Sequence, residues 1–520
     1  MAAVPVRARR EEPMRRPHLS AASAAVAALA TAGLLLTTAT PATAHGGSDA
    51  AELLGSQDVG GLPAPLITSD NVRPLRNVPG SAGISGCFLQ TAPLFVMSSL
   101  DSITVYDVRN PEAPTRVGTL PSAQFENEAM NCGERKTKSG TKRFALIGVD
   151  LYQVSPDDPN HVNAGDGNEL VIVDVTNPST PKIMSRAPGT TSTHTVSCID
   201  ETDCTYAYSA GGRGKFSIFD LTNLANPVEL DADPATAGVQ PFRSPTPAHK
   251  WNFDAAGYGT HTGFDGSSIF DVSDPRQPRL VTTTGAAGRG EDPAYPGYND
   301  FIHHNSFRPN ASAFAPFTAP SLANGNVLLI TEEDYEQTDC SQAGSFHTWK
   351  VNTLDGTPDA IVPLDKVELS DLGNFPSPVG AFCSAQWFSY HPSGIVAIGF
   401  YGGGMQLIDV RDPLDIKPYG HAVSGVSEVW DAYWMPVYTS KGRMTAQKTN
   451  IVYAVDVVRG LDVFEVDLPG ATRLAQPTAL GVGNPMTTWE WPEEGVPLVL
   501  LLVALAGSAV LRRRVRPTRS

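Results

Sequence analysis

The sequence is poor in the features that identify common enzyme classes. It has six cysteines in 520 residues and no CxxC pair, so a cysteine-rich zinc module is not expected. A GxSxG elbow, a phosphate-binding loop, an HExxH helix and a dinucleotide fingerprint are also missing. Any site chemistry must therefore come from residues that the fold brings together from distant parts of the chain.

Long hydrophobic runs occur only near the two ends of the chain. Near the N-terminus, five arginines between Arg7 and Arg16 precede an apolar stretch from Ala21 to Leu36. The segment Ala42-Thr43-Ala44 then fits the small-residue pattern of a cleavage site. We therefore expect residues 1–44 to be a secretory signal peptide; the alternative interpretation is a short membrane anchor.

The second apolar run, Val496 to Leu511, carries no charge and is followed by a cluster of arginines. It is short for the ~30 Å hydrocarbon core, but the flanking Trp489, Trp491 and arginines can extend the span. We expect a transmembrane helix over residues 495–511, a linker over 471–494 and a basic cytoplasmic tail over 512–520. Because basic residues favour the cytoplasmic side, the body should be an extracellular ectodomain held on the cell membrane by a single span.

The part of the chain between the two terminal segments is strongly acidic. Outside the two terminal segments the chain has 28 basic and 52 acidic residues. This balance makes nucleic acid an unexpected partner, because phosphate backbones bind cationic surfaces. It is compatible with an extracellular protein or glycan as a partner, and with cation binding.

All six cysteines lie in the expected exported part, which favours disulfides. Cys198 and Cys204 flank a short polar turn and could staple a hairpin. Cys87 with Cys132, and Cys340 with Cys383, are plausible pairs between neighbouring repeats. Six cysteines allow 15 connectivities, so this pairing stays one of several.

A repeated pattern runs through the middle of the chain. An apolar strand ends in an acid, and Asn or Asp before Pro follows, a combination that starts a turn. Upstream, glycines mark a hairpin with an earlier strand. The seven copies of the core strand begin at Ile103, Leu170, Phe216, Ser268, Phe346, Met405 and Leu461.

Four short strands per repeat predict a blade of a β-propeller. We therefore expect an all-β fold, a seven-bladed β-propeller of four-stranded blades over residues 81–470, preceded by a linker over 45–80. A pair of β-sandwiches is the alternative architecture, but it does not explain a four-strand repeat.

The second core strand, Leu170 to Asp174, spells LVIVD and is followed by Asn177-Pro178. This resembles the LVIVD-repeat proteins, bacterial and archaeal surface propellers, over roughly residues 84–468. The resemblance implies the fold and a place at the cell surface, and says little about activity, because most family members lack an assigned reaction. Copies five and seven depart from the pattern, with Lys350 and Glu465 in place of the aspartate.

Histidines recur where the first strand of a blade should line the central channel. His194, His249 and His304 could converge on the axis, and Glu333, which ends a second strand, could add a carboxylate. Imidazole suits zinc, copper or iron, so these four residues are a candidate site for a divalent metal in the channel. Side chains alternate along a strand, so His303 and His304 cannot both point inward; we choose His304.

Two interpretations of these histidines stay open. They are either metal ligands, with ring nitrogens roughly 3–4 Å apart, or hydrogen-bonding remnants of the repeat that fill a wet channel. The matching places in other blades hold Asn127, Gln386 and Asp431. Two functions therefore stay open. The protein is either an extracellular binding or scaffold module or a metal-dependent extracellular enzyme that could be a redox one.

Overall fold

The computed structural model describes residues 66–470, together with 58–59 and 62–63. Gaps within that range fall at 80–81, 100–101, 122–127, 150–168, 212–213, 265, 285–300, 335–336, 338, 358, 374–382 and 426. The expected signal peptide and transmembrane helix lie outside the described residues. Within the described part, no helix is long and apolar enough to cross a membrane.

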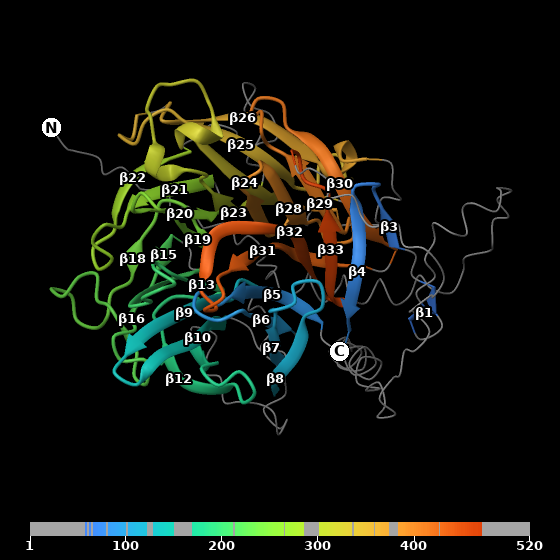
Figure 1. Ribbon diagram of the computed structural model, residues 1–520. Helices are drawn as coiled ribbons and strands as arrows, with labels where there is room; N and C mark the ends of the chain where they lie inside the picture. The colour runs from blue at the N-terminus through green and yellow to red at the C-terminus, as the bar shows by residue number, and fades with distance from the viewer. Residues whose placement is uncertain are drawn as a thin grey trace, which may run out of the picture. The chain divides into compact units, whose positions relative to one another are not determined.

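Seven antiparallel sheets surround a central axis, as the sequence predicted (Figure 1). The strands of each blade are given from the inner to the outer one. Blade one has β5 Gly83–Phe88, β6 Leu94–Ser99, β7 Ser102–Asp107 and β8 Thr115–Pro121, and blade two has β9 Asn131–Thr137, β10 Gly140–Val149, β11 Glu169–Asp174 and β12 Lys182–Pro188. Blade three has β13 Thr195–Cys198, β14 Tyr206–Ala210, β16 Ile218–Asp220 and β17 Val228–Glu229, and blade four has β19 Ala248–Phe253, β20 Tyr258–Gly263, β21 Gly266–Asp271 and β22 Arg279–Thr283.

The last three blades follow the same order. Blade five has β23 Ile302–Phe307, β24 Val327–Glu333, β25 Ser345–Val351 and β26 Ile361–Glu368. Blade six has β27 Phe388–His391, β28 Ile395–Gly399, β29 Met405–Asp409 and β30 Lys417–Ser424. Blade seven has β31 Val429–Tyr438, β32 Met444–Asp456 and β33 Gly460–Val466. Smaller elements are β1 Asp58–Val59, β2 Leu62–Pro63, β15 Lys215–Phe216, β18 Phe242–Arg243, and the 3-10 turns η2 Ala311–Ala313, η3 Leu322–Asn324 and η4 Leu369–Asp371.

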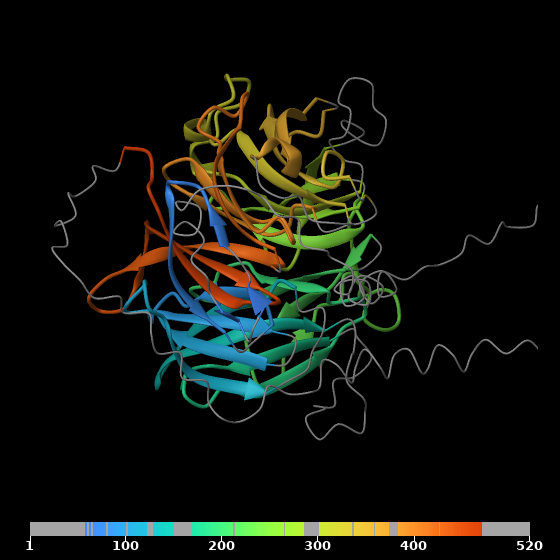
Figure 2. The same ribbon diagram turned by 90° about the vertical axis from the view of Figure 1, so that its right-hand side faces the viewer.

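The N-terminal part of the described chain closes the ring. Strand β4 (Val72–Val78) pairs with β33 as the outer strand of blade seven, and β3 (Leu66–Thr68) adds a fifth strand to blade six (Figures 1 and 2). The expected linker over 45–80 is therefore wrong for this stretch. The repeat pattern misses it because these outer strands carry exposed charge, as in Arg73 and Arg76, in place of a buried apolar run.

Buried apolar side chains form seven clusters, one between each pair of adjacent blades. The LVIVD strand β11 contributes to two of them: Val171 and Val173 pack toward blade one, and Leu170 and Ile172 toward blade three. Both faces of this strand are buried, which explains its continuous hydrophobic run.

The acid at the end of the repeat strand starts the turn. Asp174 Oδ1 accepts a hydrogen bond from the Thr176 amide at 2.8 Å, and Asn177 Oδ1 then accepts from the Ser179 amide at 3.3 Å. Asp107 in blade one makes the same contact with the Arg109 amide. These Asx turns are the physical reason for the repeated acid and for the Asn-Pro or Asp-Pro that follows.

The three disulfides are the three pairs that the sequence analysis favoured. Cys87–Cys132 joins the inner strands of blades one and two, and Cys198–Cys204 staples the β13–β14 hairpin. Cys340–Cys383 links the blade-five segment before β25 to the segment before β27 of blade six.

Candidate metal centre in the central channel

Inner strands from neighbouring blades bring five metal-binding side chains to one place. They form two groups that share His249: Glu128, His194 and His249 in one, and His249, His304 and Glu333 in the other. Glu128 precedes β9, His194 precedes β13, His249 and His304 lie on β19 and β23, and Glu333 ends β24. All four residues proposed from the sequence therefore meet, and Glu128 joins them.

Glu128 Oε2 is the common neighbour of the three imidazoles. It lies 3.2 Å from His194 Nε2, 3.5 Å from His249 Nε2 and 3.5 Å from His304 Nε2. The Nε2 atoms of His194 and His249 are 3.1 Å apart. On the other side, His304 Nε2 is 3.6 Å from Glu333 Oε2.

Backbone geometry explains why these side chains converge. Ala129 forms a parallel bridge with Thr195, which sets the preceding residues Glu128 and His194 side by side. His249 has no Cα partner on β20, because the register shifts between Ala248 and Lys250. Such a bulge re-aims a side chain and is common beside active sites.

A second bulge lies in blade five. There the register of β23 shifts between His303 and Asn305, which leaves His304 unpaired. His304 reaches the cluster, whereas His303 contacts Ser267 Oγ at 2.9 Å. The choice of His304 over His303 agrees with this arrangement, although the bulge, rather than strict strand alternation, is responsible for it.

Neighbouring groups hold the cluster in position. The Thr195 hydroxyl donates to the carbonyl of His249 at 2.6 Å. The Tyr401 hydroxyl donates to Glu333 Oε1, which leaves Oε2 directed at His304, and Gln386 Nε2 lies 3.3 Å from the same Oε1. Tyr401 has a left-handed backbone, φ 45°, a strained conformation that often occurs at functional sites.

Electrostatics favour ionised carboxylate beside neutral imidazole. Burial alone would raise the pKa of Glu128, but its contacts with His194 and His304 hold that pKa well below its usual range. Burial lowers the pKa of His249 well below its usual range and also lowers that of His304. Neutral imidazoles keep a nitrogen lone pair, which is the form that binds metal.

The donor set fits one divalent transition metal. Ligands at 2.0–2.1 Å in a tetrahedral arrangement lie about 3.3 Å apart, close to the 3.1–3.6 Å separations of the donor atoms here. His304 is fully buried, and neither of its ring nitrogens makes a hydrogen bond within the described chain. Mixed imidazole and carboxylate donors suit zinc, iron or manganese.

The sequence analysis missed Glu128. It placed Asn127 at the matching position of blade two; Asn127 lies outside the described residues, and the adjacent Glu128 enters the cluster. Gln386 supports Glu333 as a hydrogen-bond partner. Asp431 is buried near Lys250 and is not among the residues gathered around Glu128.

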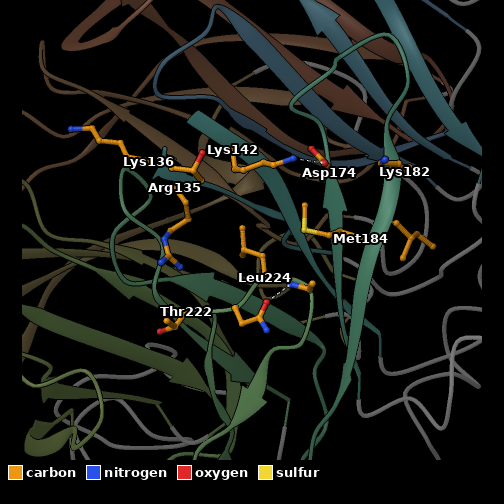
Figure 3. A pocket seen from close by; sticks show the side chains of 12 residues that line it. Arg135, Lys136, Lys142, Asp174, Lys182, Met184, Thr222 and Leu224 are labelled. Atoms are coloured by element: carbon orange, nitrogen blue, oxygen red, sulfur yellow. Dashed lines mark hydrogen bonds and ion pairs between the residues drawn. The ribbon is translucent and has the colours of Figure 1, made fainter. Parts of the chain in front are cut away.

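A cavity of about 500 Å³ on the outer part of blades two and three is a separate feature (Figure 3). Cations and apolar side chains line it, among them Arg135, Lys136, Lys142, Lys182, Met184 and Leu224. Lys142 pairs with Asp174 at 3.3 Å, and Lys182 lies on the outer edge strand β12. A lysine on such an edge opposes strand pairing between molecules, which accounts for Lys182 without a ligand.

Comparisons with known proteins identify the repeat. The family model described as LVIVD repeat matches residues 162–187. Among solved structures, the β-propeller domain of Cps50 (Swd1) from Myceliophteria thermophila covers 76% of this chain and 100% of its own, with 10% identity and a TM-score of 0.46. No curated protein matches the chain.

Proposed function

We propose that this LVIVD-repeat propeller is a metal-dependent enzyme whose centre lies in the central channel. One observation carries the proposal: two groups of possible ligands, Glu128 with His194 and His249, and His249 with His304 and Glu333, share His249, and within each group the donor atoms lie within 4.8 Å of one another. A divalent transition metal there would supply Lewis-acid or redox chemistry.

The chain's own residues have distinct roles in this proposal. His194, His249 and His304 supply nitrogen ligands, and Glu128 supplies the central carboxylate. Glu333 adds an oxygen that Tyr401 holds in place. His194 is 12% exposed and His304 is fully buried, so access to the centre is from the His194 side.

Metal titration tests the proposal. The exported body, residues 45–485, is stripped with chelator and titrated with Zn²⁺, Mn²⁺ or Fe²⁺ in a calorimeter. We expect one ion per chain, and a loss of at least about tenfold in affinity for Glu128→Gln and for His304→Ala. The control His421→Ala removes a histidine of β30, outside the cluster, and should bind as the parent does. No binding to the parent, or equal binding by His304→Ala, would contradict the proposal.

We also propose that the propeller is displayed outside the cell on a C-terminal membrane anchor. The support is the sequence pattern at the two ends of the chain. A reporter fused after Ser520 should be active in the cytoplasm, and external protease should release the propeller from intact cells. A reporter active only outside would contradict this topology.

A further inference from the structure

Two hairpins of the propeller are rich in basic residues and have no acidic residue. The β9–β10 hairpin, residues 135–143, has five basic residues, and the β31–β32 hairpin, residues 439–448, has three. These 19 positions hold eight of the 28 basic residues that lie outside the two terminal segments, against 52 acidic residues there. A local excess of one charge on an acidic protein favours a partner of the opposite charge.

Four of these cations reach water without a partner. Lys136 and Lys138 in one hairpin, and Lys441 and Arg443 in the other, are exposed, and their side chains make no hydrogen bond or ion pair within the described residues. The other cations of the β9–β10 hairpin are engaged, as Arg135 is with Asp203 at 3.3 Å. We call the four free cations the basic set, because their charge stays available to a ligand outside the chain.

The two hairpins are neighbours, because both contact the turn between β5 and β6 of blade one. Arg143 of β10 donates to the Thr91 carbonyl at 3.2 Å. In blade seven, the Met444 amide donates to the Gln90 carbonyl at 2.8 Å. The basic set therefore lies on one face of the propeller, across blades two, one and seven.

The described chain ends on the same face. Ile451 of β32 pairs with Glu465 near the end of β33, so the first seven residues of β32 and the hairpin before them extend past that end. The chain leaves β33 at Val466, and its described part ends at Gly470. The expected membrane anchor, residues 495–511, begins 25 positions further along the chain.

The metal centre lies at the other end of the inner strands. Glu128 precedes β9, and the seven residues of this strand separate Glu128 from the β9–β10 hairpin. Seven strand residues span about 23 Å. A surface that bound the basic set would therefore leave the His194 side of the metal centre uncovered.

We propose that the basic set docks on an anionic lipid surface and directs the metal centre away from the membrane. Lysine and arginine side chains attract anionic headgroups without a shaped pocket, which suits charges on exposed hairpins. The end of the described chain on this face favours a bilayer as the occupant over a soluble acidic protein. The inference rests on the proposed anchor for the orientation, and on the exposed cations for the binding.

Vesicle sedimentation tests the docking without the anchor. The protein is residues 45–485, which contain every strand of the structure. It is mixed with vesicles of phosphatidylcholine alone, or of phosphatidylcholine and phosphatidylglycerol in equal parts. We expect binding to the anionic vesicles only. Raising the salt concentration from ~0.05 M to ~0.5 M should release the protein, because salt screens exposed charges.

Two double variants remove the basic set by halves. One carries Lys136→Gln and Lys138→Gln, and the other carries Lys441→Gln and Arg443→Gln. Each cation near an anionic surface contributes about fivefold to membrane binding. Each double variant should therefore weaken binding to the anionic vesicles by about 10- to 25-fold. All four changes are at exposed positions, so the melting temperature should stay that of the parent.

Lys215→Gln with Arg243→Gln is the matched control, because it removes two exposed cations from the opposite face. Lys215 pairs with Arg243 across β15 and β18. These short strands come after Ala210, the partner of Thr195 at the start of β13, and so lie on the side of the metal centre. The control should bind the anionic vesicles as the parent does.

The outcomes separate docking from anchoring. Equal losses in the control and in both double variants would overturn the proposal, because the attraction would then not belong to this face. Absent binding, or equal binding to neutral and anionic vesicles, would overturn it as well. Binding of polyglutamate but not of vesicles through the basic set would assign the face to an acidic protein and overturn the membrane proposal. Vesicle binding through the basic set, with a reporter after Ser520 active only outside, would support docking and overturn the anchor.

Discussion

The Nε2 atoms of His194 and His249 lie 3.1 Å apart, although the two residues are 55 positions apart in the chain. Two neutral imidazoles at this distance either share one proton or direct two lone pairs at one ion. Glu128 Oε2 lies within 3.5 Å of both nitrogens. An anionic oxygen facing two imidazole nitrogens from separate blades is an arrangement that could hold a cation, as proposed above.

Tyr401 should act on the metal through Glu333. Tyr401→Phe removes the hydroxyl that donates to Glu333 Oε1, so the carboxylate gains freedom to turn away from His304. We expect a 10–100-fold loss of metal affinity with the melting temperature nearly unchanged, since outer hydrogen bonds tune metal sites to this extent. Calorimetric metal titration measures the effect.

Tyr390→Phe is the control for that variant, because Tyr390 stacks on Phe307 in the neighbouring blade and is not part of the cluster. Its affinity for metal should equal that of the parent. Equal affinities for Tyr401→Phe and the parent would show that Glu333 needs no support from Tyr401.

Asp456 should make stability fall as pH rises. Burial, followed by the nearby charge of Asp462, raises the pKa of Asp456 to about 7, well above the ~3.9 of an unfolded chain. The native state therefore keeps a proton that the unfolded state loses. The free energy of unfolding should drop between about pH 4 and pH 7 and then level off.

Asp456→Asn tests this dependence. The amide oxygen can still accept from the backbone amides of Val458 and Arg459, at 2.7 and 2.9 Å in the parent, without a charge. Denaturant unfolding from pH 4 to pH 8 should show a shallower pH slope. The variant should gain stability at pH 8, by about 4 kcal/mol at most. Parallel curves for the two proteins would contradict the raised pKa.

The two disulfides of the first three blades should differ in their contribution to stability. Cys87–Cys132 closes a separation of 45 residues and Cys198–Cys204 one of 6. Chain entropy alone then gives about 4 kcal/mol for the first and about 2 kcal/mol for the second. Double Cys→Ser variants, unfolded by denaturant, should follow that order. The reverse order would show that the hairpin staple stabilises more than its loop length implies.

Much of the fold can be predicted from the sequence because each repeat carries its own signals. The run Leu170 to Asp174 is buried on both faces, and the acid that ends it accepts the turn amide. The strands β3 and β4 could not be found in this way. They are outer strands, held by pairing with β30 and β33 far along the chain, and they lack the apolar run.

The candidate site can be predicted from the sequence only in part, and for a different reason. Histidines at the start of three inner strands point to a shared axis, so His194, His249 and His304 could be proposed together. Glu128 comes three residues before β9, and its position depends on the bridge between Ala129 and Thr195. That long-range contact, like the bulge at His304, leaves no local trace in the sequence.

X-ray absorption at the edge of the bound metal tests the central claim most directly. We predict one ion per ectodomain, with nitrogen and oxygen ligands at about 2.0–2.2 Å and the outer scattering of three imidazole rings. The imidazole signal should decrease in His304→Ala and stay unchanged in His421→Ala. An ion surrounded by oxygen alone, or the same spectrum from His304→Ala as from the parent, would contradict a metal centre built on the channel histidines.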